Sequence, residues 1–266
     1  MLQSFAFAAA SRYSGRYDAS QDPNVDVMLP RVKMWTAWNE PNLEYFLRPV
    51  PRPRGMSYAS AAARTYAKIC NAVVRGVHAA QRRMSGEKVA CGLTSPRRKA
   101  RAASTGPLEF LAALRRTNAR FDVYAHHPHP PIYTRRPGTP PDAPRTVTLG
   151  NIGVLTSLLN RLYGPKRLWI TEYAYQTRPP DYYGVSLRGQ AAYLREAYAI
   201  AKRHPRIDML VWFLLRDERT RRVPGKRGLP GWQSGLLFDQ RTHRGRAKPS
   251  FAVFRCLARR RSTAAC

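Results

Sequence analysis

Short apolar segments alternate along this chain with segments of helical periodicity, and this alternation constrains the fold more than any other feature. The apolar segments are almost uninterrupted, as in strands that are buried on both faces. Between them, apolar residues recur three and four positions apart, which is typical of helices. The alternation therefore predicts a parallel α/β architecture. The expected strands are 32–38, 88–93, 121–129, 167–173 and 208–213, and the expected helices are 4–14, 58–77, 107–116, 150–163 and 187–201.

Two α/β folds satisfy this pattern, a doubly wound sheet and a (β/α)8 barrel. No Gly-x-Gly-x-x-Gly sequence follows any of the expected strands, so nothing indicates a nucleotide-binding doubly wound sheet. Polar and aromatic residues instead gather at the carboxyl ends of the strands, which a barrel places on one rim. These residues are Asn39, Glu40, His127, Glu172 and Trp212.

Two of the expected strands end in a glutamate. Glu40 lies in Trp38-Asn39-Glu40-Pro41-Asn42, where Pro41 has no N–H to donate and ends the strand just after the acid. Glu172 lies in Ile170-Thr171-Glu172-Tyr173, 132 residues further on. Two carboxyl groups at strand ends suggest a mechanism that uses both.

These two motifs together resemble clan A of the glycoside hydrolases, the retaining (β/α)8-barrel enzymes, and most closely its cellulase-like and β-xylosidase-like families. The likeness extends from about residue 5 to residue 257. It implies that Glu40 is the acid/base at the end of the fourth barrel strand and that Glu172 is the nucleophile at the end of the seventh. Glu40 would have to be protonated at rest and Glu172 ionised.

The resemblance also implies substrate-binding residues. Asn39 matches the asparagine that bonds the sugar 2-hydroxyl, and Trp212 the eighth-strand aromatic that faces a sugar ring. His127 is the favoured match to the sixth-strand histidine, although the sequence His126-His127-Pro128-His129 leaves His129 as an alternative. A metal site at these histidines is a further alternative, but we expect no metal and no cofactor.

In the order of that clan, the helix at 4–14 is the third barrel helix. The chain would then contain only strands 4 to 8 with their helices, an N-terminally truncated barrel. No position is available for the substrate-binding arginine that the clan carries on an early strand. We expect residues 1–258 to form this partial catalytic domain, 259–266 to be a basic tail, and a complementing chain or N-terminal segment to supply the rest.

The net charge of +30 comes from 46 basic and 16 acidic residues, and it would by itself suggest a polyanion partner. Only eight of the basic residues are lysine, and the 38 arginines are spread over the whole chain, as in a compositional bias. We therefore expect no nucleic-acid partner. The basic clusters at 97–101, 219–222 and 259–261 are interpreted as solvated loops and a frayed tail.

The cysteines and the N-terminus indicate little about location. Cys70 and Cys91 lie in helical and strand patterns and are interpreted as buried free thiols, whereas Cys256 and Cys266 could pair in an oxidising compartment. No apolar run is long enough to span a membrane, and the first residues lack the basic region of a signal peptide. Full-length relatives are often secreted, but the sequence leaves the location of this chain open.

The leading hypothesis is a retaining glycosidase that acts on a β-linked polysaccharide or oligosaccharide. One alternative is an inactive, truncated remnant that at most binds carbohydrate. The other is an arginine-rich polyanion-binding protein, whose affinity would fall steeply with salt.

Overall fold

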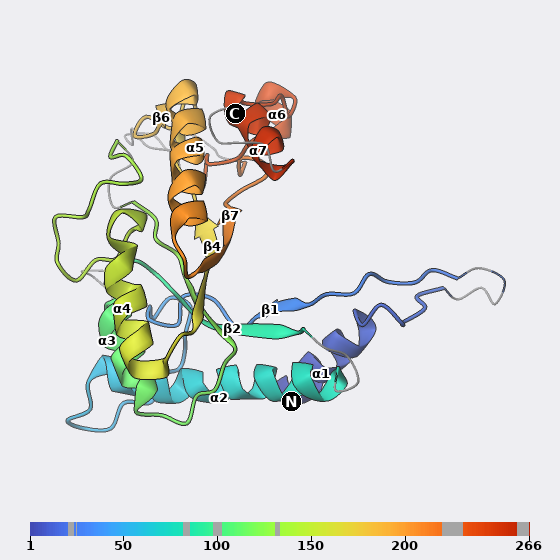
Figure 1. Cartoon of the computed structure of the whole chain (residues 1–266), viewed down its shortest axis with the longest axis vertical. Coiled ribbons are helices and arrows are strands. Elements are labelled where there is room, and N and C mark those ends of the chain that lie inside the picture. The colour runs from blue at the N-terminus through green and yellow to red at the C-terminus, as the bar shows by residue number, and fades with distance from the viewer. Residues whose placement is uncertain are drawn as a thin grey trace. The chain divides into compact units, whose positions relative to one another are not determined.

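The computed structural model describes residues 1–20, 24, 26–81, 86–97, 103–130, 134–219, 231–259 and 266. Five strands form one sheet in the order β1-β2-β3-β4-β7, which is also their order along the chain. β5 and β6 form a separate two-stranded sheet (Figure 1). The strands are β1 (Met34–Thr36), β2 (Lys88–Thr94), β3 (Val123–His126), β4 (Arg167–Tyr173), β5 (Thr177–Arg178), β6 (Val185–Ser186) and β7 (Ile207–Trp212).

Helices alternate with these strands, so the predicted α/β class is confirmed. β4 has the bounds expected from the sequence, whereas β1 is shorter than expected because the chain turns sharply after Ala37. β1 pairs with β2 and β2 with β3 in parallel register. The helices are α1 (Leu2–Arg12), α2 (Tyr58–Ala80), α3 (Pro107–Arg115), η1 (Leu149–Asn151), α4 (Ile152–Tyr163), α5 (Leu187–Arg203), α6 (Gln240–His243) and α7 (Pro249–Ala258).

The chain divides into two compact units. The first comprises Met1–His126 and Ser157–Trp169, and the second His127–Thr156 and Ile170–Cys266. The expected division at residue 258 coincides with the end of α7, but residues 260–265 of the expected tail lie outside the described residues. So do most of the residues in the basic clusters at 97–101, 219–222 and 259–261.

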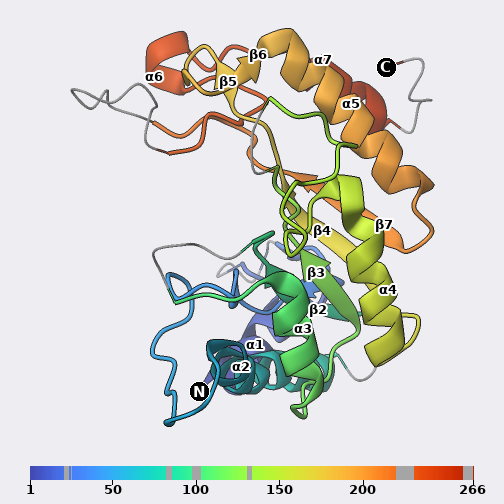
Figure 2. The same ribbon diagram turned by 90° about the vertical axis from the view of Figure 1, so that its left-hand side faces the viewer.

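In the first unit, α1 packs along α2, as both ribbon views show (Figures 1 and 2). Gly76 of α2 permits this approach, since a Cβ atom there would lie 2.5 Å from the carbonyl oxygen of Gln3 in α1. α2 begins as the sequence indicates, because the Ser57 side chain accepts a hydrogen bond from the Ser60 N–H and caps the helix.

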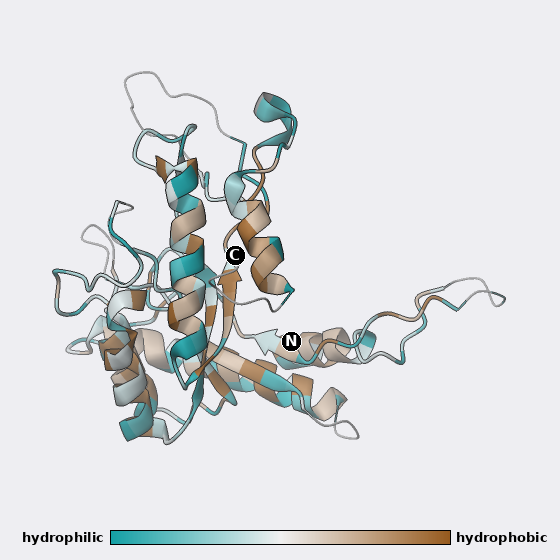
Figure 3. Cartoon of the chain, turned by 45° about the horizontal axis from the view of Figure 1, so that its top comes forward, coloured by the Kyte–Doolittle hydropathy of each residue, from teal (hydrophilic) through white to brown (hydrophobic). Residues whose placement is uncertain are grey.

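In the second unit, α5 packs against α7 and β7. Figure 3 shows alternating hydrophilic and hydrophobic bands along α5, as expected of a helix with one buried face. Gln190 lies on that face and is fully buried. Its amide donates to the carbonyl of Tyr175 and its oxygen accepts from the Ser250 hydroxyl, so α5, α7 and the segment after β4 are joined by one side chain. Among the described residues, no helix combines the length and apolar character needed to cross a membrane.

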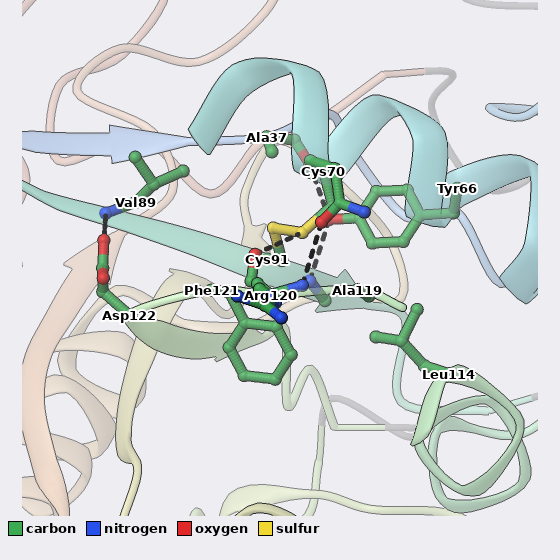
Figure 4. Close-up of a disulfide and its surroundings, with 12 residues drawn as sticks. Ala37, Tyr66, Cys70, Val89, Cys91, Leu114, Ala119, Arg120, Phe121 and Asp122 are labelled. Carbon is green, nitrogen blue, oxygen red and sulfur yellow. Dashed lines mark hydrogen bonds between the residues drawn. A yellow bond between two sulfur atoms is a disulfide. The ribbon is translucent and has the colours of Figure 1, made fainter. Parts of the chain in front are cut away.

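The expectation that Cys70 and Cys91 are free thiols is wrong. Both residues are fully buried and form a disulfide between α2 and β2, with their Cα atoms 6.0 Å apart (Figure 4). The sequence pattern placed each cysteine correctly in its element, but the pairing arises only when α2 packs on β2. Cys256 and Cys266 form a second disulfide.

Removing the Cys70–Cys91 disulfide should destabilise the protein. The bridge joins residues 21 positions apart, and closing a loop of this length in the unfolded chain contributes about 3 kcal/mol. We expect the double variant Cys70→Ala/Cys91→Ala to unfold at a clearly lower denaturant concentration than the unmodified protein. Thiol alkylation followed by mass spectrometry checks the bridge directly, and labelling of Cys70 and Cys91 without reductant would contradict it.

Candidate active site

The backbone after β1 places Glu40 beyond the end of that strand and beside the end of β2. The Ala37 N–H donates to the carbonyl of Ala90 over 3.0 Å, and the Glu40 N–H donates to the carbonyl of Leu93 over 3.0 Å. Tyr66, fully buried in α2, joins the same two strands because its hydroxyl donates to Ala37 O and accepts from the Gly92 N–H. Glu40 is therefore held against the end of β2, as expected of a residue at a strand end.

This loop and the adjoining end of β2 contain unusual backbone conformations. Trp38, Glu40 and Leu93 all have positive φ angles, of 76°, 37° and 45°. Residues other than glycine rarely adopt positive φ angles, and each one that does lowers the stability of the folded protein by about 1–3 kcal/mol. Trp38 is held there by its indole N–H, which donates to the carbonyl of Phe46 over 2.6 Å. Strain that surrounding contacts maintain is common at functional sites and marks this loop as a candidate.

Asn42, the last residue of the motif, fastens the loop to the rest of the first unit. Its side chain is fully buried, donates to the carbonyls of Ser95 and Thr105 and accepts from the Ser95 N–H over 2.8 Å. The sequence contained Asn42 in the motif without indicating this role, because its partners lie more than 50 residues away. Asn39, predicted to bind the sugar 2-hydroxyl, is half-buried in the bend before Glu40.

In the second unit, Glu172 lies at the end of β4 beside two histidines. Its Oε2 atom is 3.6 Å from His127 Nδ1 and 3.5 Å from His129 Nε2. The Glu172 side chain is 23% exposed, so its carboxylate is partly open to solvent. Both His127 and His129 thus adjoin Glu172, and the choice of His127 as the match to the sixth-strand histidine stays a prediction.

The two histidines have different surroundings. His127 is 1% exposed and its Nε2 lies 3.0 Å from the hydroxyl of Thr171, on the same strand as Glu172. Burial lowers the pKa of His127 to about 4, against the opposing effect of Glu172. At neutral pH His127 is therefore an uncharged group that adjoins the Glu172 carboxylate and lies within hydrogen-bond distance of the Thr171 hydroxyl. His129 is also buried, but its Nδ1 has no hydrogen-bond partner among the described residues.

The low pKa of His127 predicts a loss of stability in acid. In the unfolded chain the histidine takes up a proton near pH 6.5, whereas the folded protein resists protonation until about pH 4. The contribution of neutral His127 is complete above pH 6.5 and is lost as the pH falls to about 4, with a total of about 3 kcal/mol. We expect His127→Gln to lack this part of the pH dependence. Denaturation curves at pH 7 and pH 5 check it, and an equal difference between the two proteins at both pH values would contradict it.

Aromatic rings adjoin His129 in the second unit. Trp232 lies over His129 with ring centroids 5.3 Å apart and planes tilted by 33°, and Phe213 meets the Trp232 ring edge-on at 5.4 Å. Glu218 fixes Trp232 through its backbone, since Oε2 accepts from the Trp232 N–H and the Glu218 N–H donates to Trp232 O, both over 2.9 Å. Trp232 is half-buried, so part of its surface remains available.

Trp212, predicted to face a sugar ring, lies deeper. It is 6% exposed, and its indole N–H donates to the carbonyl of Ser234 over 2.9 Å. Its ring meets that of Tyr173 edge-on at 6.3 Å. These contacts favour a packing role, and Trp232, which adjoins His129, is the more accessible of the two tryptophans. The substrate-binding roles of Asn39, His127 and Trp212 and the expected lack of a metal and a cofactor stay predictions.

Several solved structures are similar to this chain in fold. The chain is similar to the GH39 enzyme from Xanthomonas axonopodis pv. citri, with 16% identity and a TM-score of 0.58 over 98% of this chain. It is also similar to a family 39 glycoside hydrolase from the gut symbiont Bacteroides cellulosilyticus WH2, with 18% identity and a TM-score of 0.54 over 93% of this chain. The chain has a glycoside-hydrolase-like fold. A β-glucuronidase from Faecalibacterium prausnitzii matches with 15% identity and a TM-score of 0.52 over 98% of this chain.

The chain spans less than half the length of these enzymes, namely 45%, 41% and 35%. No protein-family model matches it, and no curated protein is similar to it in sequence. The likeness at these identities concerns the fold. It is consistent with part of a (β/α)8 barrel, in which strand carboxyl ends bear the functional residues.

Proposed function

We propose that this chain is the catalytic part of a retaining glycoside hydrolase of the clan A type, corresponding to barrel strands 4 to 8. The observation that carries the proposal is the partly exposed Glu172 carboxylate at a strand end, contacted by His127 and His129. The glycosidase fold of the structural neighbours supports it.

In the proposed mechanism Glu172 is the nucleophile. Its carboxylate attacks the anomeric carbon of a β-linked sugar and forms a glycosyl ester, while the bond to the leaving-group oxygen breaks and its electron pair stays with that oxygen. Neutral His127 suits this role, because it adjoins the carboxylate without neutralising its charge, and His129 Nε2 lies 3.5 Å from the same carboxylate oxygen. Trp232 offers an aromatic surface to the sugar.

Glu40 is the proposed acid/base. Its proton passes to the departing oxygen in the first step, and its carboxylate takes a proton from the water that hydrolyses the glycosyl ester in the second. The strained backbone at Trp38 and Glu40 supports a functional role for this loop. Asn39, directly before Glu40, is proposed to bond the sugar 2-hydroxyl.

The proposal is tested by the stereochemistry of hydrolysis. Nitrophenyl β-xyloside, β-galactoside and β-glucuronide are suitable substrates, and the last reflects the name of one structural neighbour and the positive charge of this chain. We expect proton NMR to show the β-anomer as the first product. A first-formed α-anomer would contradict the double displacement. Sugar binding without turnover would favour the inactive remnant, and salt-sensitive polyanion binding without any sugar binding would favour the polyanion-binding alternative.

We further propose that another polypeptide segment completes the sheet at β1. β1 is the terminal strand of the sheet order, and Met34 within it is 57% exposed. Unpaired edges of this kind are usually covered or avoided. Reading the genomic DNA upstream of the Met1 codon in the same frame tests this. An open frame encoding further strand patterns supports a segment of the same chain, whereas early stop codons would leave a separate polypeptide as its source.

A further inference from the structure

A cavity of about 580 Å³ lies in the first unit, between the beginning of α2 and the end of α3. None of the residues proposed for glycoside hydrolysis lines it. Its charged residues are all arginines, namely Arg54, Arg64 and Arg116. The other lining residues are Gly55, Met56, Ser57, Ser60, Ala113 and Thr117.

The three arginines have no carboxylate partner in the part of the chain that the structure describes. Other arginines do, since Arg31, Arg135 and Arg136 form ion pairs with glutamate or aspartate. All three arginines are exposed, so water and salt screen their mutual repulsion, and an anion placed among them would be attracted by all three. Guanidinium groups bind the oxygens of phosphate and sulfate in pairs, through two parallel N–H donors.

Neutral groups of the cavity add to the same preference. The Ser60 hydroxyl can donate a hydrogen bond to an anion, whereas the Ser57 and Thr117 hydroxyls already donate to Ser60 Oγ and to the carbonyl of Leu114. α2 is 23 residues long, begins at the cavity and has no acidic residue in its first turn. Ser57 caps the Ser60 N–H, and no carboxylate of that turn offsets the rest of the partial positive charge at the helix N-terminus.

We propose that this cavity binds an oxyanion, phosphate or sulfate, carried as an ester on a larger molecule. The positive charge of the three arginines and their N–H donors favour an oxyanion over an uncharged ligand. The volume exceeds that of a single ion, which leaves room for part of the molecule that bears it. The site is independent of the proposed glycosidase activity, because it shares no residue with it.

Isothermal titration calorimetry on the whole chain tests the site, with glucose 6-phosphate and glucose 6-sulfate as probes and glucose as the uncharged control. We expect saturable binding of at least one ester and none of glucose at the same concentrations. Arg64→Gln and Arg116→Gln should each weaken binding roughly tenfold or more, the effect of losing a charged hydrogen bond. The relative affinity of the two esters identifies the preferred oxyanion.

Arg188→Gln is the matched control, because Arg188 is an exposed helical arginine of α5 and its loss changes the net charge equally. It should leave binding unchanged. Equal weakening by Arg188→Gln and Arg64→Gln would show diffuse attraction to a basic protein and overturn the proposal. Absence of saturable binding by both esters would overturn it as well. Circular dichroism of each variant confirms that it is folded.

Discussion

Replacing Glu172 by glutamine is expected to reduce the rate of glycoside hydrolysis about 10⁴-fold or more. The amide keeps the shape of the side chain and its contacts with His127 and His129, but it cannot form a glycosyl ester. Steady-state rates with a nitrophenyl glycoside measure the effect. Because the nucleophile acts in both steps, the loss should be large whatever the leaving group.

Glu40→Gln provides the contrast that separates the two proposed roles. A nitrophenolate leaving group needs little protonation, so the first step should survive better in this variant than with a sugar leaving group. Asp26→Asn, which removes one exposed negative charge elsewhere, should leave the rate unchanged. Full activity in Glu172→Gln would refute the assignment of the nucleophile.

Replacing Lys248 by methionine is expected to destabilise the protein by about 3–5 kcal/mol, because it leaves the buried Asp217 carboxylate without its partner. Lys248 is 2% exposed and Asp217 5% exposed. Lys248 Nζ lies 2.7 Å from Asp217 Oδ1 and 2.8 Å from the Thr177 hydroxyl, and it also donates to Gln233 O. Burial raises the pKa of the Asp217 carboxyl and lowers that of the Lys248 ammonium, so each charge depends on the other.

Denaturant unfolding of three proteins checks this prediction. The double variant Lys248→Met/Asp217→Leu should recover part of the lost stability, since no buried charge remains unpaired. Recovery should be incomplete, because Asp217 Oδ1 also accepts the Gly235 N–H over 2.8 Å. An unfolding midpoint of Lys248→Met equal to that of the unmodified protein would contradict the argument. The pair fastens the segment that contains Trp232, so the variant should also be examined for weakened sugar binding.

The local elements were largely predictable from the sequence, because each depends on neighbouring residues. The uninterrupted apolar run at β4 gave its bounds, Ser57 marked the start of α2, and Pro107 opens α3 as its first residue. Glu40 and Glu172 were found for the same reason, since each lies close after an apolar run, and such carboxylates lie in or just beyond the end of a strand. Their catalytic roles still await experiment.

Contacts between segments that lie far apart in the sequence could not be predicted from local sequence patterns. Cys70 and Cys91 pair only because α2 packs on β2, and Lys248 meets Asp217 across 31 residues of chain. Trp212, which the sequence predicted to face a sugar ring, is buried with its N–H bonded, whereas Trp232 is half-buried and lies over His129. The sequence by itself determined the strands, the helices and the two glutamates, because periodicity and chain breakers act locally. Only the tertiary structure decided the disulfide, the buried ion pair and the surroundings of Glu172, because burial and contact depend on how the elements pack.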